Sequence, residues 1–378
     1  MNLQLKKMKL SYWEYKHWFS NVDFTIVGSG IVGLFCALHL RTLHPEAKIL
    51  VLERATLPNG ASTKNAGFAC FGSISEILED LKFHTEQEVF DLVSNRWQGL
   101  QLLIKTLGID ALELKSYGGY EVFLDHQESE YEYCLSKISF VNDFLRPIFK
   151  NDVFEKVNDR FDFKKTQENL IYNLFESQID TGKMMLNLIQ KCTANNINIL
   201  NGCMVKDYHE NDSNVEISLD NFSFTSRKLI FTTNGFASKL VNNEVKPARA
   251  QVLITEPIKN LDIKGTFHLD KGYYYFRNID DRILLGGGRN LDFEGETTTE
   301  NETTELIQKQ LDYLLKNVIL PNYDYQVAMR WSGIMGVGNV KSPIIKALSS
   351  HVYCGVRMGG MGVAIGSLVG EKLAKIIK

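Results

Sequence analysis

The stretch that most constrains the fold is a glycine-rich turn between two apolar segments near the N-terminus. Residues 24–27 are mostly apolar, as in a buried strand, and lead directly into Gly28-Ser-Gly-Ile-Val-Gly33. Apolar residues then recur with helical spacing through residues 31–38, and a second apolar run at residues 49–52 ends on Glu53. This order of strand, glycine turn, helix and strand predicts a βαβ unit.

The spacing of the three glycines indicates what the turn could bind. Gly28 permits a tight turn, Gly30 lets main-chain N–H groups approach a pyrophosphate, and Gly33 lets the helix pack close to the strand. The helix N-terminus adds its dipole. Glu53 stands where a carboxylate accepts hydrogen bonds from ribose hydroxyls and repels a 2′-phosphate, which disfavours an NADP-type nucleotide. The alternative is an ordinary βαβ unit with a glycine turn.

Composition narrows the class of protein. The chain has 378 residues, enough for two domains, and its 44% hydrophobic and 23% charged residues are ordinary for a globular protein. A net charge of −3 gives no reason to expect nucleic acid or an anionic membrane as partner, and no apolar run is long enough to span a membrane. The six cysteines are scattered without a C-x-x-C pair, so we expect core residues, a cytoplasmic protein and no metal site.

A loop rich in small polar residues follows Glu53. Residues 59–67 read Asn-Gly-Ala-Ser-Thr-Lys-Asn-Ala-Gly, and the hydroxyls of Ser62 and Thr63 suit a second phosphate or a ribityl chain. Its place after a nucleotide-binding βαβ unit favours a cofactor contact over a plain connecting loop, which is the alternative.

Three motifs together resemble the start of the D-amino-acid-oxidase-type FAD oxidoreductases: the glycine turn, Glu53-Arg54, and residues 60–67. The aromatic residues 11–13 are most similar to γ-glutamylputrescine oxidase, and sarcosine and glycine oxidases belong to the same group. The resemblance implies an α/β (α+β) fold with a Rossmann-type FAD-binding domain, interrupted by a mixed-sheet substrate domain that covers the flavin. It assigns residues 1–110, 177–246 and 330–378 to the FAD-binding domain, and residues 111–176 and 247–329 to the substrate domain.

A second glycine-rich segment lies near the C-terminus. Residues 352–366 carry five glycines within twelve residues where a strand leads into a helix. A helix N-terminus stabilises negative charge, and the resemblance places this loop below the flavin, beside the ring edge that is anionic when reduced. The alternative is a simple helix junction of Schellman type.

The remaining elements are predicted from periodicity. Helices are expected at residues 74–107, 126–150, from 181 after an N-cap at Asp180 or Thr181, and 305–317. Strands are expected at residues 118–124, 170–174, 197–200, 203–205, 215–219, 222–226, 228–233, 249–255, 272–277, 283–289 and 328–336. Residues 11–19 are expected to form an aromatic arm that packs on the body of the protein.

Two positions depart from the family pattern. An arginine clamps the substrate carboxylate in D-amino-acid and glycine oxidases, and Met335 stands at the matching place here. Sarcosine oxidase has a lysine near flavin N5 that helps oxygen react, and the matching position here is about Leu284. No cysteine matches the covalent flavin attachment of sarcosine oxidase, so we expect FAD to be held non-covalently.

The sequence therefore predicts an FAD-dependent oxidoreductase that dehydrogenates a C–N bond of a primary or secondary amine, or of an amino acid, by hydride transfer to flavin N5. The electron acceptor would be oxygen or a quinone, and the oligomeric state stays open. One alternative is oxidation of a 2-hydroxy acid or a glycerophosphate, with a basic pocket drawn from Arg277, Arg289, Arg330 and Arg357. The other is a flavin-bound module of a larger assembly without turnover of its own.

Tyr274 and Arg357 are the candidate substrate contacts, with Tyr273 and Tyr275 expected on the opposite strand face from Tyr274. The candidate cofactor-binding residues lie in the two glycine-rich turns, the small-residue loop and the returning strands. They are Gly28, Ser29, Gly30, Ile31, Val32, Gly33, Glu53, Arg54, Ala61, Ser62, Thr63, Asn65, Ala66, Gly67, Val205, Thr232, Thr233, Asn234, Gly235, Gly333, Arg357, Met358, Gly359, Gly360, Met361 and Gly362.

Overall fold

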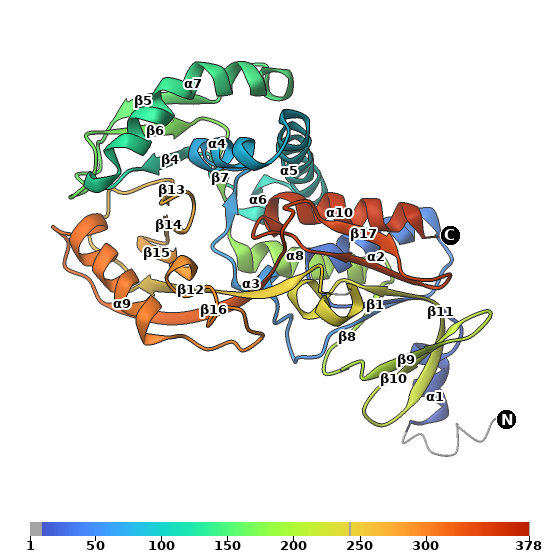
Figure 1. The fold of residues 1–378 in the computed structure, drawn as a ribbon. Helices are drawn as coiled ribbons and strands as arrows, with labels where there is room; N and C mark the ends of the chain where they lie inside the picture. Colours follow the sequence, from blue (N-terminus) through green and yellow to red (C-terminus); the bar gives the residue numbers. More distant parts are fainter. Residues whose placement is uncertain (1–9, 242, 378) are drawn as a thin grey trace.

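Two eight-stranded sheets organise the protein, each with its own covering helices (Figure 1). The computed structural model describes residues 10–241 and 243–377, so residues 1–9, Asn242 and Lys378 of the predicted FAD-binding domain lie outside the described residues. The mixed α/β architecture confirms the predicted fold class.

The first sheet holds the βαβ unit at its centre. Its path runs β17-β18-β11-β1-β2-β8, in which β18, β11, β1, β2 and β8 are parallel and β17 is antiparallel to β18. Strands β9 and β10 form an antiparallel meander on β11. The bounds are β1 Val22–Val27, β2 Ile49–Leu52, β8 Asn198–Leu200, β9 Asp207–Glu210, β10 Val215–Ser218, β11 Ser223–Phe231, β17 Ile344–Ala347 and β18 Val352–Val356.

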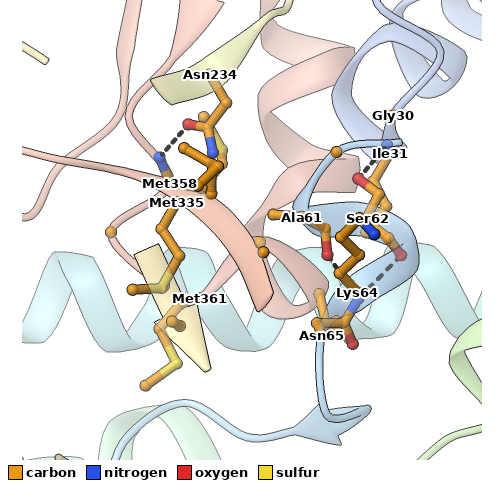
Figure 2. Close-up of a pocket in the computed structure, with 18 of the residues that line it drawn as sticks. Gly30, Ile31, Ala61, Ser62, Lys64, Asn65, Asn234, Met335, Met358 and Met361 are labelled. Atoms are coloured by element: carbon orange, nitrogen blue, oxygen red, sulfur yellow. Dashed lines mark hydrogen bonds between the residues drawn. The ribbon is translucent and has the colours of Figure 1, made fainter. Parts of the chain in front are cut away.

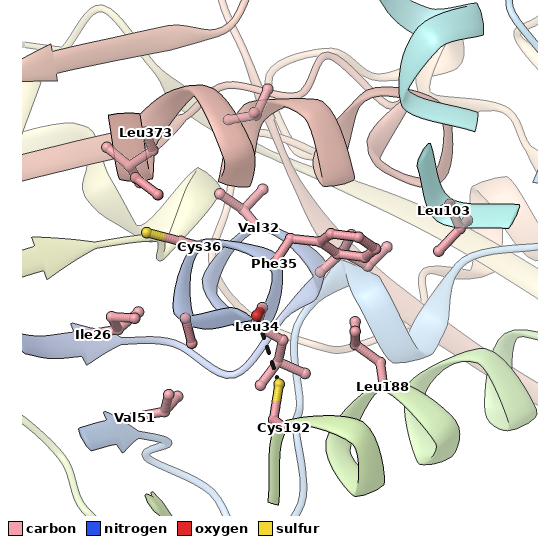
Figure 3. Close-up of a cluster of buried hydrophobic side chains, with 14 of the residues drawn as sticks. Ile26, Val32, Leu34, Phe35, Cys36, Val51, Leu103, Leu188, Cys192 and Leu373 are labelled. Carbon is pink, nitrogen blue, oxygen red and sulfur yellow. Dashed lines mark hydrogen bonds between the residues drawn. The ribbon is translucent and has the colours of Figure 1, made fainter. Parts of the chain in front are cut away.

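Helix α2 (Ile31–Leu43) is buried against this sheet (Figure 3). Its apolar side chains meet residues from β1, β2, α5 (Glu86–Leu107), α8 (Thr181–Ala194) and α10 (Gly362–Ile376). Phe35 and Leu34 are fully buried in this cluster, so the helix that follows the glycine turn cannot shift without disturbing the core. The core therefore fixes the position of the α2 N-terminus.

The second sheet is mixed, as predicted, and runs β16-β12-β15-β14-β13-β4-β6-β5. All neighbours are antiparallel except β4 and β13. Asp280 and Asp281 take positive φ values of 46° and 55° in the turn between β14 and β15, as a tight hairpin requires. The bounds are β4 Gly119–Val122, β5 Phe154–Asn158, β6 Asn169–Asn173, β12 Lys246–Thr255, β13 Thr266–Leu269, β14 Tyr274–Ile279, β15 Arg282–Gly287 and β16 Val327–Val337.

Helices α7 (Glu128–Phe149) and α9 (Glu305–Leu314) lie on the lobe formed by the second sheet (Figure 1). Aromatic stacking fills the core of this lobe, where Phe267 and Phe276 lie parallel with ring centroids 4.5 Å apart. The boundary predicted at residue 330 falls inside β16, which pairs with β12 along its length and so belongs to the second sheet.

Several predicted elements differ from the observed ones. Residues 74–107 form two helices, α4 (Ile74–Phe83) and α5, because Thr85 accepts a hydrogen bond from Glu88 N–H and starts a new helix with a capping box. The strands predicted at residues 222–226 and 228–233 are one strand, β11, and residues 203–205 are not a strand. Strands β3 (Phe68–Ala69), β5, β7 (Ser177–Gln178), β9, β13 and β17 were not predicted. Asp180, not Thr181, is the N-cap of α8.

The N-terminal aromatic arm packs only in part. It comprises α1 (Tyr12–Glu14) and a π-helical turn, Tyr15–Phe19. Phe19 is buried with its ring centroid 4.7 Å from that of Phe222, whereas Tyr12 and Trp13 are 66% and 64% exposed. The predicted packing is therefore right for Phe19 and wrong for Tyr12 and Trp13. No helix among the described residues has the length and apolarity needed to cross a membrane.

Candidate functional site

A cavity of about 920 Å³ joins the two sheets. One wall comes from the ends of β1, β2 and β11 and the first turns of α2 and α10; the other comes from β12, β13, β14, β15 and β16. Figure 2 shows the α2 N-terminus, the loop around Ser62, and Met358 and Met361 before α10, which belong to the first wall, together with Met335 of β16 from the second wall.

The glycine turn shapes one end of the cavity. Gly28 has φ +105°, and a Cβ on Gly33 would lie 2.1 Å from Gly28 O and 2.7 Å from Thr232 Oγ1, so no side chain fits there. Ile31 N–H donates to Ser62 Oγ at 3.0 Å (Figure 2), and the next N–H groups at the start of α2 have no partner within the helix. This end therefore offers main-chain donors and a positive helix end to an anion.

Glu53 lies beside this turn at the end of β2, and its side chain is buried and ordered. Its Oε2 accepts hydrogen bonds from Ser29 N–H at 3.3 Å and from Ser29 Oγ at 2.9 Å, and its Oε1 accepts from Ala55 N–H at 3.2 Å. Glu53 lines the cavity, so the carboxylate is held in place with acceptor capacity left for ribose hydroxyls.

The small-residue loop forms a short helix, α3 (Ala61–Lys64), whose geometry Asn65 fixes. The Asn65 side chain donates to Ala61 O and Ser62 O, and its Oδ1 accepts from Gly67 N–H at 2.8 Å and from Thr181 Oγ1 at 2.9 Å. Ser62 faces the cavity. The Thr63 hydroxyl instead donates to Pro58 O and Gly60 O, within its own loop.

The junction between β18 and α10 forms a further part of the wall. Asn234 Oδ1 accepts hydrogen bonds from the N–H groups of Arg357 and Met358 at 3.1 and 3.2 Å, which anchors the loop (Figure 2). Met335, Met358 and Met361 line the space beside it. Polarizable methionine side chains suit contact with a flat aromatic group.

The structure brings most of the predicted cofactor residues to this cavity. Ser29, Gly33, Thr63, Gly235 and Arg357 do not line it: Ser29 contacts Glu53, the two glycines allow close packing, and Thr63 and Arg357 bond to main-chain carbonyls. The predicted residues that line it are Gly28, Gly30, Ile31, Val32, Glu53, Arg54, Ala61, Ser62, Asn65, Ala66, Gly67, Val205, Thr232, Thr233, Asn234, Gly333, Met358, Gly359, Gly360, Met361 and Gly362.

Both predicted substrate contacts point elsewhere. Tyr274 is buried in the core of the second sheet. Its neighbours in the chain line the cavity instead: Tyr275 on the next position of β14, as the alternation of side chains along a strand requires, and Tyr273 just before the strand. The Arg357 guanidinium donates to Ser342 O at 2.9 Å and to Glu244 O at 3.2 Å, away from the cavity.

Of the four arginines considered for a basic pocket, Arg289 is the one that lines the cavity in the described part of the chain. Its guanidinium lies 4.7 Å from the centroid of the Phe293 ring and forms no ion pair with a described carboxylate. Burial lowers the pKa of Arg289, which still leaves it charged at neutral pH. Arg277 is buried beside Gly67, and Arg330 is paired with Asp312 at 2.7 Å.

A buried histidine faces the cavity and was not predicted. His268 Nε2 lies 2.7 Å from Glu176 Oε1, and both side chains are almost fully buried. Burial lowers the pKa of His268, but the charge of Glu176 and the hydrogen bond with it outweigh burial and raise the pKa to about 9. His268 is therefore protonated at neutral pH. The sequence signal was faint, because the short strand β13 alternates Phe267 and Leu269 inward with His268 outward.

Comparisons with known proteins agree with this geometry. The family model described as FAD dependent oxidoreductase (DAO) matches residues 23–376. A sequence search of curated proteins finds no match. The fold is similar to three solved structures at 16% identity, a level that shows the fold alone.

The first is iminodiacetate oxidase from Chelativorans sp. BNC1, with a TM-score of 0.75 over 94% of this chain and 95% of that one. Glycine oxidase from Geobacillus kaustophilus has a TM-score of 0.74 over 94% of both chains. L-proline dehydrogenase from P. horikoshii has a TM-score of 0.71 over 95% of this chain and 93% of that one. Because the family match spans nearly the whole sequence, this chain belongs to the DAO family and is an FAD-dependent oxidoreductase.

Proposed function

We propose that the protein dehydrogenates a C–N bond of a small amine or amino acid in the cavity between its two sheets, with FAD held non-covalently. The observation that carries the proposal is the continuity of that cavity, which runs from the glycine turn to the aromatic and basic wall of the second sheet. A nucleotide at one end and a small molecule at the other would share one continuous cavity.

The first wall fits the dinucleotide part of FAD. The α2 N-terminus and Ser62 would hold the pyrophosphate, and Glu53 the ribose. The first turn of α10 directs free N–H groups at the methionine-lined space, so negative charge that develops there is stabilised. When bound, FAD supplies the hydride acceptor for the carbon next to the substrate nitrogen.

The second wall would bind the substrate. Tyr273 and Tyr275 supply apolar surface that excludes water, and Arg289 can hold a carboxylate. Arg289 would thus do the task for which Met335 is unsuited. The iminodiacetate oxidase, glycine oxidase and L-proline dehydrogenase that share this fold are all named for substrates with a carboxylate and an amine nitrogen, which supports an amino acid over a simple amine.

Arg289 also supports a second candidate function, the oxidation of a 2-hydroxy acid at its C–O bond, because the guanidinium would recognise the substrate carboxylate and not its nitrogen. The compounds that separate the two candidates are glycine, N-methylglycine, proline, iminodiacetate, a polyamine, a D-amino acid and a 2-hydroxy acid. Each is added without oxygen to the FAD-bound protein while the flavin absorption is followed.

Bleaching by a compound with an amine nitrogen is the expected result. Bleaching by the hydroxy acid alone would replace the proposal with the second candidate. A flavin that no compound reduces would favour the remaining alternative, a flavin-bound module of a larger assembly without turnover of its own. Oxygen and a soluble quinone are then added separately to the reduced protein to identify the acceptor. Acid precipitation should release the flavin into the supernatant; flavin retained in the pellet would contradict non-covalent binding.

A further inference from the structure

Three buried side chains with different ligand atoms meet at one place on the cavity wall. They are Cys70, Glu176 and His268, and their sulfur, oxygen and nitrogen atoms lie within 4.8 Å of one another. The residues come from three distant parts of the chain: Cys70 follows β3 (Phe68–Ala69), Glu176 precedes β7 (Ser177–Gln178), and His268 lies on β13. The fold, and not local sequence, gathers them.

One atom of this cluster lacks the partner that a buried charged group requires. Glu176 Oε1 is hydrogen-bonded to His268, but Glu176 Oε2 is buried with no hydrogen-bond partner. Leaving such an atom unpaired costs free energy. The neighbouring strand makes room for it: a Cβ on Gly119 would lie 2.4 Å from Glu176 Oε2. The carboxylate is therefore held in a fitted space with one acceptor unused.

The set of atoms matches the ligands of a particular class of ion. A thiolate, an imidazole nitrogen and a carboxylate oxygen are the ligands of Zn²⁺, at about 2.3, 2.0 and 2.0–2.2 Å. Three ligand atoms at these distances from one zinc ion would lie less than 4.8 Å from one another, as the three atoms here do. The sulfur argues against Ca²⁺ and Mg²⁺, which prefer oxygen ligands alone.

We propose that Cys70, Glu176 and His268 form a binding site for a zinc-like divalent cation. On binding, the Cys70 thiol and the imidazole nitrogen that becomes a ligand lose their protons to solvent, and the hydrogen bond between His268 and Glu176 is exchanged for two metal bonds. Cys70 and His268 line the cavity, so the ion's fourth coordination position faces it. Water, or a nitrogen or oxygen atom of a molecule in the cavity, takes that position.

The proposed metal site can be tested directly on FAD-bound protein that carries no affinity tag. The protein is incubated with Zn²⁺, excess metal is removed by dialysis, and zinc per protein is measured by mass spectrometry alongside the Kd. Cys70→Ser and Glu176→Gln each remove one ligand with little change in volume. Cys203→Ser is the matched control, because Cys203 is the least buried of the six cysteines and the obvious competing thiol.

We expect one zinc per wild-type and Cys203→Ser protein, and a weakening of at least about 10- to 100-fold in both cluster variants, since changes outside the ligand shell already cost that much. Zinc that is not retained by the wild type, or is retained equally by Cys70→Ser and Glu176→Gln, would overturn the proposal. So would loss of zinc in Cys203→Ser alone.

A second measurement keeps the test valid if a variant folds poorly. Co²⁺ in a site of this kind absorbs at longer wavelengths than oxidised flavin, so wild-type protein should gain a new band with Co²⁺ that Zn²⁺ removes. The flavin spectrum of each variant reports whether it is folded. A wild-type protein that gains no such band contradicts the site, whatever the variants do. Reduction of the flavin by substrate in metal-free protein tests the proposed function separately.

Discussion

The two ends of the cavity are made of different parts of the polypeptide. At the nucleotide end the main chain makes the surface, through the turn at Gly28 and the first turn of α2, and few side chains are required. At the other end side chains form the surface: His268 on β13, Tyr275 on β14 and Arg289 in the turn after β15. FAD binding at the nucleotide end should therefore be lost when the backbone is disturbed. Substrate binding at the other end should be lost when single functional groups are removed.

The largest effect should follow a backbone change at the nucleotide end. Gly33→Ala would place a Cβ 2.1 Å from Gly28 O, so α2 or the turn must move. We expect overpacking of about 1–3 kcal/mol or more and loss of bound FAD. Flavin per protein and the melting temperature measure both. The matched control is Gly60→Ala, where an added Cβ meets nothing within 4 Å, and equal losses in both variants would refute the argument.

Removing the cationic group at the other end of the cavity should have the next largest effect. Arg289→Met would lose charge-assisted hydrogen bonds to a substrate carboxylate, worth about 1.5–3 kcal/mol, or roughly 10- to 150-fold in kcat/KM. FAD content should not change. Arg330→Met is the control, because Arg330 pairs with Asp312 away from the cavity. If the two variants lose the same activity towards carboxylate substrates, Arg289 does not bind them.

A side-chain change at the nucleotide end should have a smaller effect. Ser62→Ala removes the acceptor for Ile31 N–H, a capping interaction worth about 0.5–2 kcal/mol, and should weaken FAD binding by roughly 2- to 30-fold. Thr63→Ala removes a hydroxyl that bonds only within its loop, so its FAD Kd should stay close to that of the wild type. A titration of apoprotein with FAD compares them, and the reverse order would show that Thr63 faces the phosphate after all.

The smallest effect separates two adjacent tyrosines. Tyr275→Phe removes a hydroxyl beside the cavity and should change KM by roughly 2- to 10-fold, the equivalent of one neutral hydrogen bond. Tyr274→Phe alters a residue in the core of the second sheet and should leave KM unchanged. Steady-state kinetics of both variants on one substrate decides the point, and a larger change for Tyr274→Phe would reverse the assignment of the two strand faces.

This contrast explains what the sequence could reveal. Gly28, Gly30, Gly33 and Glu53 lie within one short βαβ unit, so their spacing alone predicts how they act together. Cys70 and Glu176 meet because β3 and β7 pair antiparallel just before Cys70 and just after Glu176, and His268 joins them from β13, far along the chain. No local pattern encodes that pairing, and strand β13 is too short to show a clear alternation.

The tyrosines show a limit of another kind. Alternation correctly separates Tyr274 from Tyr273 and Tyr275, but it does not say which face meets the cavity. That depends on the aromatic core of Phe267 and Phe276, which takes up the face shared with Tyr274. The direction of the Arg357 side chain was unpredictable for a related reason. Its guanidinium donates to Ser342 O and Glu244 O, away from the cavity, and loop geometry sets the positions of these acceptors.

The long pairing of β12 with β16 has a mechanical consequence. The ladder runs from Lys246 and Val337 at one end to Thr255 and Val327 at the other, and Gly336 O near its end accepts a hydrogen bond from Gly359 N–H, in the loop after β18. Swinging the two lobes apart would bend this ladder or break that bond, at about 0.5–1.5 kcal/mol for each hydrogen bond lost. The ladder acts as a stiff brace, so small molecules should reach the cavity through local motion of its rim and not through a hinge between lobes.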